Sequence, residues 1–141
     1  MNRRRTTSSI LLACWTALIV FAVVPIGRYR EQPARRQIAW IPFVSRPVTL
    51  GDIARNVLLY VPFGYLQART LVHPTAWRAL AYSAALSAGT EATQVYSRGR
   101  YPSTTDVVCN LIGAMAGFAW ARQRTSRPPY PASGTPVSTD R

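Results

Sequence analysis

The feature that most constrains this chain is an apolar run at residues 10–26, which contains no charged side chain. Three further apolar segments follow it, at residues 53–72, 77–95 and 107–121. A helix as long as the third segment, 19 residues, spans about 28 Å, close to the roughly 30 Å hydrocarbon thickness of a bilayer. The alternative, a soluble helical protein with a basic surface, leaves the first run without a place to pack. We therefore predict an all-α, membrane-embedded bundle of four transmembrane helices with antiparallel neighbours.

The predicted bundle leaves a basic segment at residues 1–9 and a proline- and arginine-rich tail at residues 122–141, which we expect to be disordered. The first run also resembles the apolar part of a secretory signal. No small-x-small cleavage site follows Val24, however, only Pro25, Ile26 and Gly27. We interpret residues 10–26 as an uncleaved first helix and residues 10–121 as one transmembrane domain.

The formal net charge is +12, and arginine supplies all 17 basic side chains. Such a balance often indicates nucleic-acid binding, which needs the arginines on one soluble face. Here they cluster between apolar segments, as membrane flanks do. The cluster of Arg3, Arg4 and Arg5 favours a cytoplasmic amino terminus, and four spans return the carboxyl terminus to the same side. We predict a multi-pass protein of the bacterial plasma (inner) membrane, with the lipid bilayer and not nucleic acid as its partner.

Cysteine and histidine indicate neither a disulfide nor a metal site. In an antiparallel bundle, Cys14 and Cys109 would lie near opposite ends of their spans, too far apart for a disulfide. The single histidine, His73, provides no zinc-binding spacing. We predict no metal and no cofactor.

Acidic side chains are rare, and two of the five, Glu91 and Asp106, lie where the third helix leads into the fourth. Antiparallel order places the start of the second helix, the end of the third and the start of the fourth at one membrane face, which is extracytoplasmic if the amino terminus is inside. An ionised side chain buried in a bilayer costs on the order of 3 kcal/mol or more, so these acids need partners or a wet cavity. We predict a polar pocket, with Glu91 and Asp106 as a candidate acid–base pair and these candidate ligand-binding residues: Asn56, Gln94, Arg98, Arg100 and Asn110.

Each of these residues also has a structural interpretation. The segments TLGD at 49–52 and STTD at 103–106 fit the pattern of a capping box with Asp in place of Glu. The amides can serve as hydrogen-bond partners between helices, and the arginines can contact lipid headgroups.

Small residues predict where helices meet. Gly113 and Gly117 have the spacing that lets helix backbones approach in lipid, and we expect their face to bring Asp106 and Asn110 against Glu91 and Gln94. Pro62 removes a backbone hydrogen bond from the second helix. We expect the segment IAWIPFV at 38–44 to lie at the membrane interface over the pocket, as a lid.

Five motifs follow one another: IAWIPF at 38–43, NVLLYVPFGYL at 56–66, EATQ at 91–94, GRYPSTTD at 99–106 and NLIGAMAG at 110–117. Together they resemble the VanZ-like family over about residues 38–118. The resemblance implies a compact bundle of about four transmembrane helices, and the family's namesake is linked to low-level resistance to the glycopeptide teicoplanin. Many relatives carry an acid where this chain has Ser103, which weakens any mechanism that requires three carboxylates. The family's polar and small positions fall on Asn56, Pro62, Gly64, Glu91, Gln94, Arg100, Asp106, Asn110 and Gly113.

We expect the pocket to bind, or to help process, a lipid or glycan of the cell envelope, and the resemblance implies a tie to glycopeptide resistance. Candidate partners are a cell-wall precursor, a glycolipid or an envelope protein complex. One alternative is a membrane enzyme that acts on lipid-linked glycans or phospholipid headgroups through Glu91 and Asp106. Another is a structural accessory subunit of an envelope complex, whose polar cluster sets the helix register.

Cysteine labelling tests the predicted topology. In a Cys14→Ser, Cys109→Ser background, Ser103→Cys should react with an impermeant thiol reagent on intact cells, because it lies at the predicted outer face. Ser133→Cys, in the predicted cytoplasmic tail, should react only after the cells are broken. The reverse pattern would place the pocket in the cytoplasm and remove the cell-wall interpretation.

Overall fold

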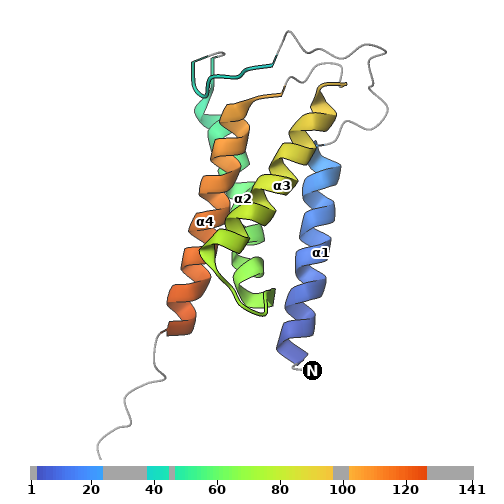
Figure 1. The fold of residues 1–141 in the computed structure, drawn as a ribbon, viewed down its shortest axis with the longest axis vertical. Helices are drawn as coiled ribbons and strands as arrows, with labels where there is room; N and C mark the ends of the chain where they lie inside the picture. Colours follow the sequence, from blue (N-terminus) through green and yellow to red (C-terminus); the bar gives the residue numbers. More distant parts are fainter. Residues whose placement is uncertain (1–2, 24–37, 45–46, 97–101, 127–141) are drawn as a thin grey trace, which may run out of the picture.

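The computed structural model describes residues 3–23, 38–44, 47–96 and 102–126. They form four helices, α1 (Arg3–Val23), α2 (Leu50–Thr70), α3 (Ala76–Gln94) and α4 (Thr104–Ser126). The described residues contain no strand, only an isolated bridge between Ala39 and Ser103. Figure 1 shows that α1 and α3 end, and α2 and α4 begin, at the same end of the bundle. The prediction of an all-α chain is confirmed.

Among the described helices, only α1 is long and apolar enough to cross a membrane, over Arg5–Val23. Only 6% of its apolar window is buried inside the protein, so most of its surface faces outward. The other three helices are less apolar because they carry buried polar side chains, among them Asn56, Gln67 and Ser83. Length and composition thus support one membrane span, and the four-span bundle stays a prediction.

Helix boundaries differ from the predicted ones mainly at the two ends of the chain. α1 begins at Arg3, so residues 3–9 are helical, and α4 continues to Ser126, so residues 122–126 are helical and not part of a tail. The last turns of α4 are stabilised by ring contacts. Trp120 lies with its ring centre 5.3 Å from that of Tyr65 on α2, and the Arg124 guanidinium lies 4.8 Å from the Trp120 ring centre. Residues 127–141, the rest of the predicted tail, lie outside the described part of the chain.

α2 and α4 form the most extensive helix contact, and three glycines permit it. A Cβ atom on Gly113 would overlap the backbone of Val57, and one on Gly117 would overlap that of Val61. A Cβ atom on Gly64 of α2 would likewise overlap the backbone of Ala114 of α4. The two backbones therefore meet with no side chain between them, as small residues allow. The glycine face of α4 thus packs on α2, and not on the helix that carries Glu91 and Gln94.

α1 packs along α2 through a core cluster and hydrogen bonds at two depths. Trp15 Nε1 donates to the carbonyl oxygen of Leu59 over 2.9 Å. The Arg5 guanidinium donates to the carbonyl oxygen of Thr70 over 3.2 Å, near the other end of α1. The buried members of the cluster are Ile19, Tyr60, Phe63 and Ala114.

α2 begins at a capping box, which confirms the structural interpretation of residues 49–52. The Thr49 hydroxyl accepts the backbone N–H of Asp52, and the Asp52 carboxylate accepts the backbone N–H of Thr49. The Thr49 hydroxyl also donates to the Asp52 carboxylate over 2.7 Å. This hydrogen bond and the one from the Thr49 N–H lower the pKa of the Asp52 carboxyl, which lies ahead of the predicted span at 53–72. Pro62 lies inside α2, and the helix continues on both sides of it.

Gly113→Ala should destabilise the protein, because the added methyl group would force α2 away from α4. Overpacking of this kind costs typically about 1–3 kcal/mol. Thermal unfolding in detergent, followed by circular dichroism, measures the effect. Gly89→Ala is the matched control, since a Cβ at this helical glycine meets nothing within 4 Å, and alanine there should leave stability unchanged or raise it by up to about 1 kcal/mol. Equal Tm values for the two variants would contradict the close α2–α4 contact.

Candidate functional site

A small polar pocket of about 110 Å³ lies at the end of the bundle where α1 and α3 end. All four helices contribute to its wall: Ala22 and Val23 from α1, Arg55, Asn56, Leu59 and Tyr60 from α2, Glu91 and Gln94 from α3, and Asp106 and Asn110 from α4. The structure therefore brings together five residues that the sequence singles out, namely Asn56, Glu91, Gln94, Asp106 and Asn110.

Glu91 links α3 to the start of α4. Its side chain is buried; Oε2 accepts the backbone N–H of Ser103 over 2.8 Å, and Oε1 accepts an N–H of the Gln94 amide over 3.3 Å. Ser103 immediately precedes α4, so its N–H is the one that the acid of a capping box would accept. The pattern STTD predicts Asp106 for this role, whereas the acceptor here is Glu91 from another helix. Glu91 is thus a structural contact as well as part of the pocket wall.

A second polar contact joins the same two helices deeper in the bundle. Asn110 Nδ2 donates to the Ser87 hydroxyl over 2.9 Å, and both side chains are buried. The predicted contact of Asn110 with the third helix is therefore present, but its partner is Ser87, one turn before Glu91.

Three buried polar atoms of the pocket residues have no hydrogen-bond partner among the described residues: Asn56 Nδ2, Tyr60 Oη and Asn110 Oδ1. The Tyr60 hydroxyl lies near those of Ser87 and Thr90, without a well-formed hydrogen bond to either. Leaving a buried donor or acceptor unpaired costs about 1–3 kcal/mol, so folded proteins rarely do it. The pocket wall thus offers donors and an acceptor to water or to a ligand.

Arg55 and Tyr60 are pocket residues that the sequence analysis does not place in the site. Arg55 makes an ion pair with Asp52, 3.6 Å between Nη2 and Oδ1, and 60% of its side chain is exposed. It directly precedes Asn56, which puts it at nearly the same depth. Tyr60 lies four residues after Asn56 and hence on the same helical face, a signal that could have identified it. Ala22 and Val23 carry no such signal, because nothing in an apolar run marks its contact with α2.

Two predicted ligand-binding residues, Arg98 and Arg100, lie outside the described residues, so their place in the site stays a prediction. Within the described ranges, no three His, Cys, Asp or Glu side chains gather in a way that could hold a metal ion.

Residues 38–44, the predicted lid, attach to the start of α4. The backbone N–H of Ala39 donates to Pro102 O over 3.0 Å, and the N–H of Thr104 donates to Ala39 O over 3.1 Å. The N–H of Phe43 donates to the Thr105 hydroxyl over 2.8 Å. No residue of this segment belongs to the pocket wall. It lies beside the pocket and holds the residues whose backbone Glu91 binds, while Trp40 stays largely exposed.

Comparisons with known proteins identify the family of this chain. No curated protein and no solved structure matches the chain. The family model described as VanZ/LLP1 matches residues 9–124, which include all four pocket-forming helices except the first turns of α1 and the last residues of α4. The chain therefore belongs to the VanZ/LLP1 family.

Proposed function

We propose that this chain is an integral membrane protein whose polar pocket binds the head of an envelope lipid or of a lipid-linked glycan. Family membership and the apolar helix α1 indicate membrane association. The observation that carries the proposal is the set of unpaired buried atoms on the pocket wall, above all Asn56 Nδ2 and Asn110 Oδ1. A ligand with its own donors and acceptors would satisfy both and remove the cost of leaving them unpaired.

The position of the pocket supports a ligand that comes from the membrane surface. Its lining residues include Val23 and Gln94, which end α1 and α3, and Asp106 in the first turn of α4. Figure 1 shows that these helix ends lie at one end of the bundle. With a cytoplasmic amino terminus and four spans, this end is extracytoplasmic, and the multi-pass topology is part of the proposal. Phospholipid headgroups, lipid-linked glycans and cell-wall precursors are the polar groups available there.

A second candidate function is hydrolysis or transfer on the same ligand. It is favoured by one observation, that Glu91 and Asp106 line the same small cavity. Two carboxylates in one site can divide the roles of acid and base. The contact of Glu91 with the backbone of Ser103 favours binding, because it employs one carboxylate oxygen in holding α3 to the start of α4, while Gln94 of the same helix contacts the other oxygen.

The pair Asn56→Leu and Gln67→Leu separates a binding role from a structural one. Both residues are buried on α2 and each has an unpaired atom, but only Asn56 lines the pocket. Asn56→Leu should lower the amount of lipid that copurifies with the full chain, while its Tm in detergent should hold or rise, because an unpaired buried donor is removed. Gln67→Leu should leave the bound lipid unchanged. Mass spectrometry of extracted lipids measures the first effect and circular dichroism the second.

The proposal fails if Asn56→Leu unfolds the protein as readily as Gly113→Ala, or if both Leu variants retain lipid as the native chain does.

The Glu91→Gln variant tests the second candidate function, catalysis. An amide oxygen can still accept the Ser103 N–H, so this variant should fold. Time-dependent conversion of an added lipid by the native chain, lost in Glu91→Gln, would favour catalysis over binding. Teicoplanin susceptibility of cells that express each variant is a further readout, in line with the resistance that the family resemblance implies.

A further inference from the structure

We propose that the ligand of the polar pocket is an aminophospholipid, with its ammonium-ethyl head in the pocket and an acyl chain along α1. This inference rests on the proposed function and narrows it to one class of lipid. Three features of the structure carry it: the size of the pocket, the charges on its wall and an apolar groove on α1 that ends close to it.

The pocket volume limits the head to a small group. An apolar cavity of about 150 Å³ holds benzene, so a pocket of about 110 Å³ holds about four or five heavy atoms. The ammonium-ethyl end of an ethanolamine headgroup has this size. A sugar ring with its hydroxyl groups is too large to enter whole.

The charges on the described wall suit a zwitterionic head. Glu91 and Asp106 supply two carboxylates on the α3–α4 side, whereas Arg55 supplies one guanidinium on α2. An ammonium group has three donors and no acceptor, which matches the carboxylates and the unpaired Asn110 Oδ1. The phosphate of the same lipid accepts hydrogen bonds, which matches Arg55 and the unpaired Asn56 Nδ2.

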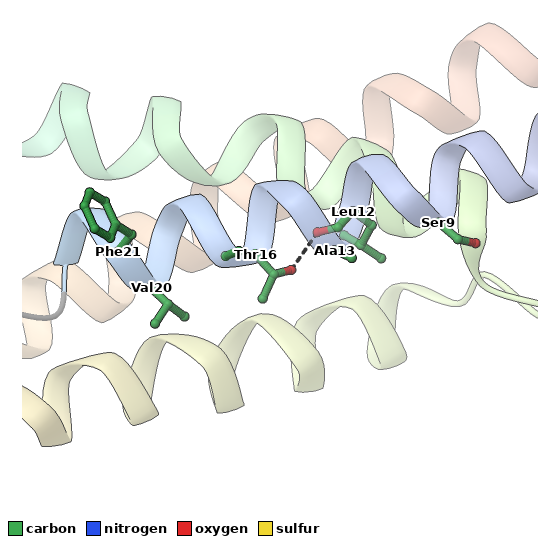
Figure 2. A pocket seen from close by; sticks show the side chains of 7 residues that line it. Ser9, Leu12, Ala13, Thr16, Val20 and Phe21 are labelled. Carbon is green, nitrogen blue, oxygen red and sulfur yellow. Dashed lines mark hydrogen bonds between the residues drawn. The ribbon is translucent and has the colours of Figure 1, made fainter.

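A groove on α1 provides a path for the acyl chain. It runs from Ser9 to Phe21, and its lining is almost wholly apolar. Figure 2 shows Thr16 and Val20 on the side of α1 that faces α3. The Thr16 hydroxyl donates to the carbonyl oxygen of Leu12 over 2.8 Å, so its polar atom is satisfied within the helix.

The groove ends close to the pocket wall and has about the length of one lipid leaflet. Val20 lines the groove, and Val23, three residues farther along and neighbouring it on the surface of α1, lines the pocket. Ser9 and Phe21 are 12 residues apart, which is about 18 Å along a helix. Half of the hydrocarbon core is about 15 Å thick. An acyl chain attached to a head in the pocket would therefore cover this face of α1. A second copy of the chain would cover it too, but would leave the polar atoms of the pocket unpaired.

Native mass spectrometry tests which lipid headgroup the pocket binds. The full chain is reconstituted in nanodiscs with equal amounts of phosphatidylethanolamine and phosphatidylglycerol, and the lipid that stays bound after release is identified. We expect phosphatidylethanolamine to be retained and Asp106→Asn to weaken its retention about tenfold, equivalent to about 1.4 kcal/mol. Arg55→Gln, at an exposed side chain, is the second variant in case Asp106→Asn does not fold. It should weaken the retention of both lipids, because both carry the phosphate.

Two neighbouring tryptophan substitutions test whether the acyl chain of the lipid lies in the groove on α1. Ala13→Trp fills the groove, whereas Cys14→Trp adds the same bulk at an exposed position outside it. Ala13→Trp should lower the retained phosphatidylethanolamine several-fold, and Cys14→Trp should retain it as the native chain does. The oligomeric state of each variant is read from the same spectra.

The outcomes separate this inference from the proposed function. If phosphatidylglycerol is retained equally or better, while Asn56→Leu still lowers bound lipid, the head assignment is wrong and the binding function stands. If Ala13→Trp and Cys14→Trp behave alike, or if Ala13→Trp only breaks up an oligomer, the tail assignment is wrong. If the native chain retains neither lipid and Asn56→Leu changes nothing, both the inference and the proposed function fail.

Discussion

The close contact between the backbones of α2 and α4 determines where the polar groups of this protein lie. With Gly113 against Val57 and Gly117 against Val61, the two helices have little freedom to slide or rotate against each other. Asn56 directly precedes Val57, and Asn110 lies one turn before Gly113. The glycine contact therefore brings two asparagines from distant parts of the sequence to one depth. α3, which packs mainly on α4, then closes the pocket with Glu91.

Glu91 connects the stability of the bundle to the chemistry of its pocket. Its carboxylate accepts a backbone N–H at the start of α4 and also forms part of the pocket wall. Because the donor is the main chain of Ser103, the contact does not depend on that side chain. The bridge between Ala39 and Ser103 holds the same short segment from its other side. An effect of ligand on Glu91 would thus reach α3, α4 and residues 38–44 together.

Much of the fold could be predicted because it follows from local pattern. Apolar segments bounded by polar or charged residues predicted four helices, and the TLGD pattern predicted the cap of α2. Prediction was poorer at the chain ends, where α4 continues through Arg124 because that side chain packs on Trp120. The STTD pattern was misleading at α4. A capping box is a local motif, and here an acid from another helix, Glu91, accepts the N–H instead.

The sequence by itself determined that the chain is helical, that its polar residues gather near the start of α2, the end of α3 and the start of α4, and which family it resembles. The spacing of apolar and polar residues and the order of the segments along the chain are sufficient for these conclusions. Only the tertiary structure decided which of those residues face one another, because that depends on the helix register set by the α2–α4 contact. It added Arg55 and Tyr60 to the pocket, turned the glycine face toward α2 and paired Asn110 with Ser87. These outcomes depend on which surfaces fit together closely, and no single segment contains that information.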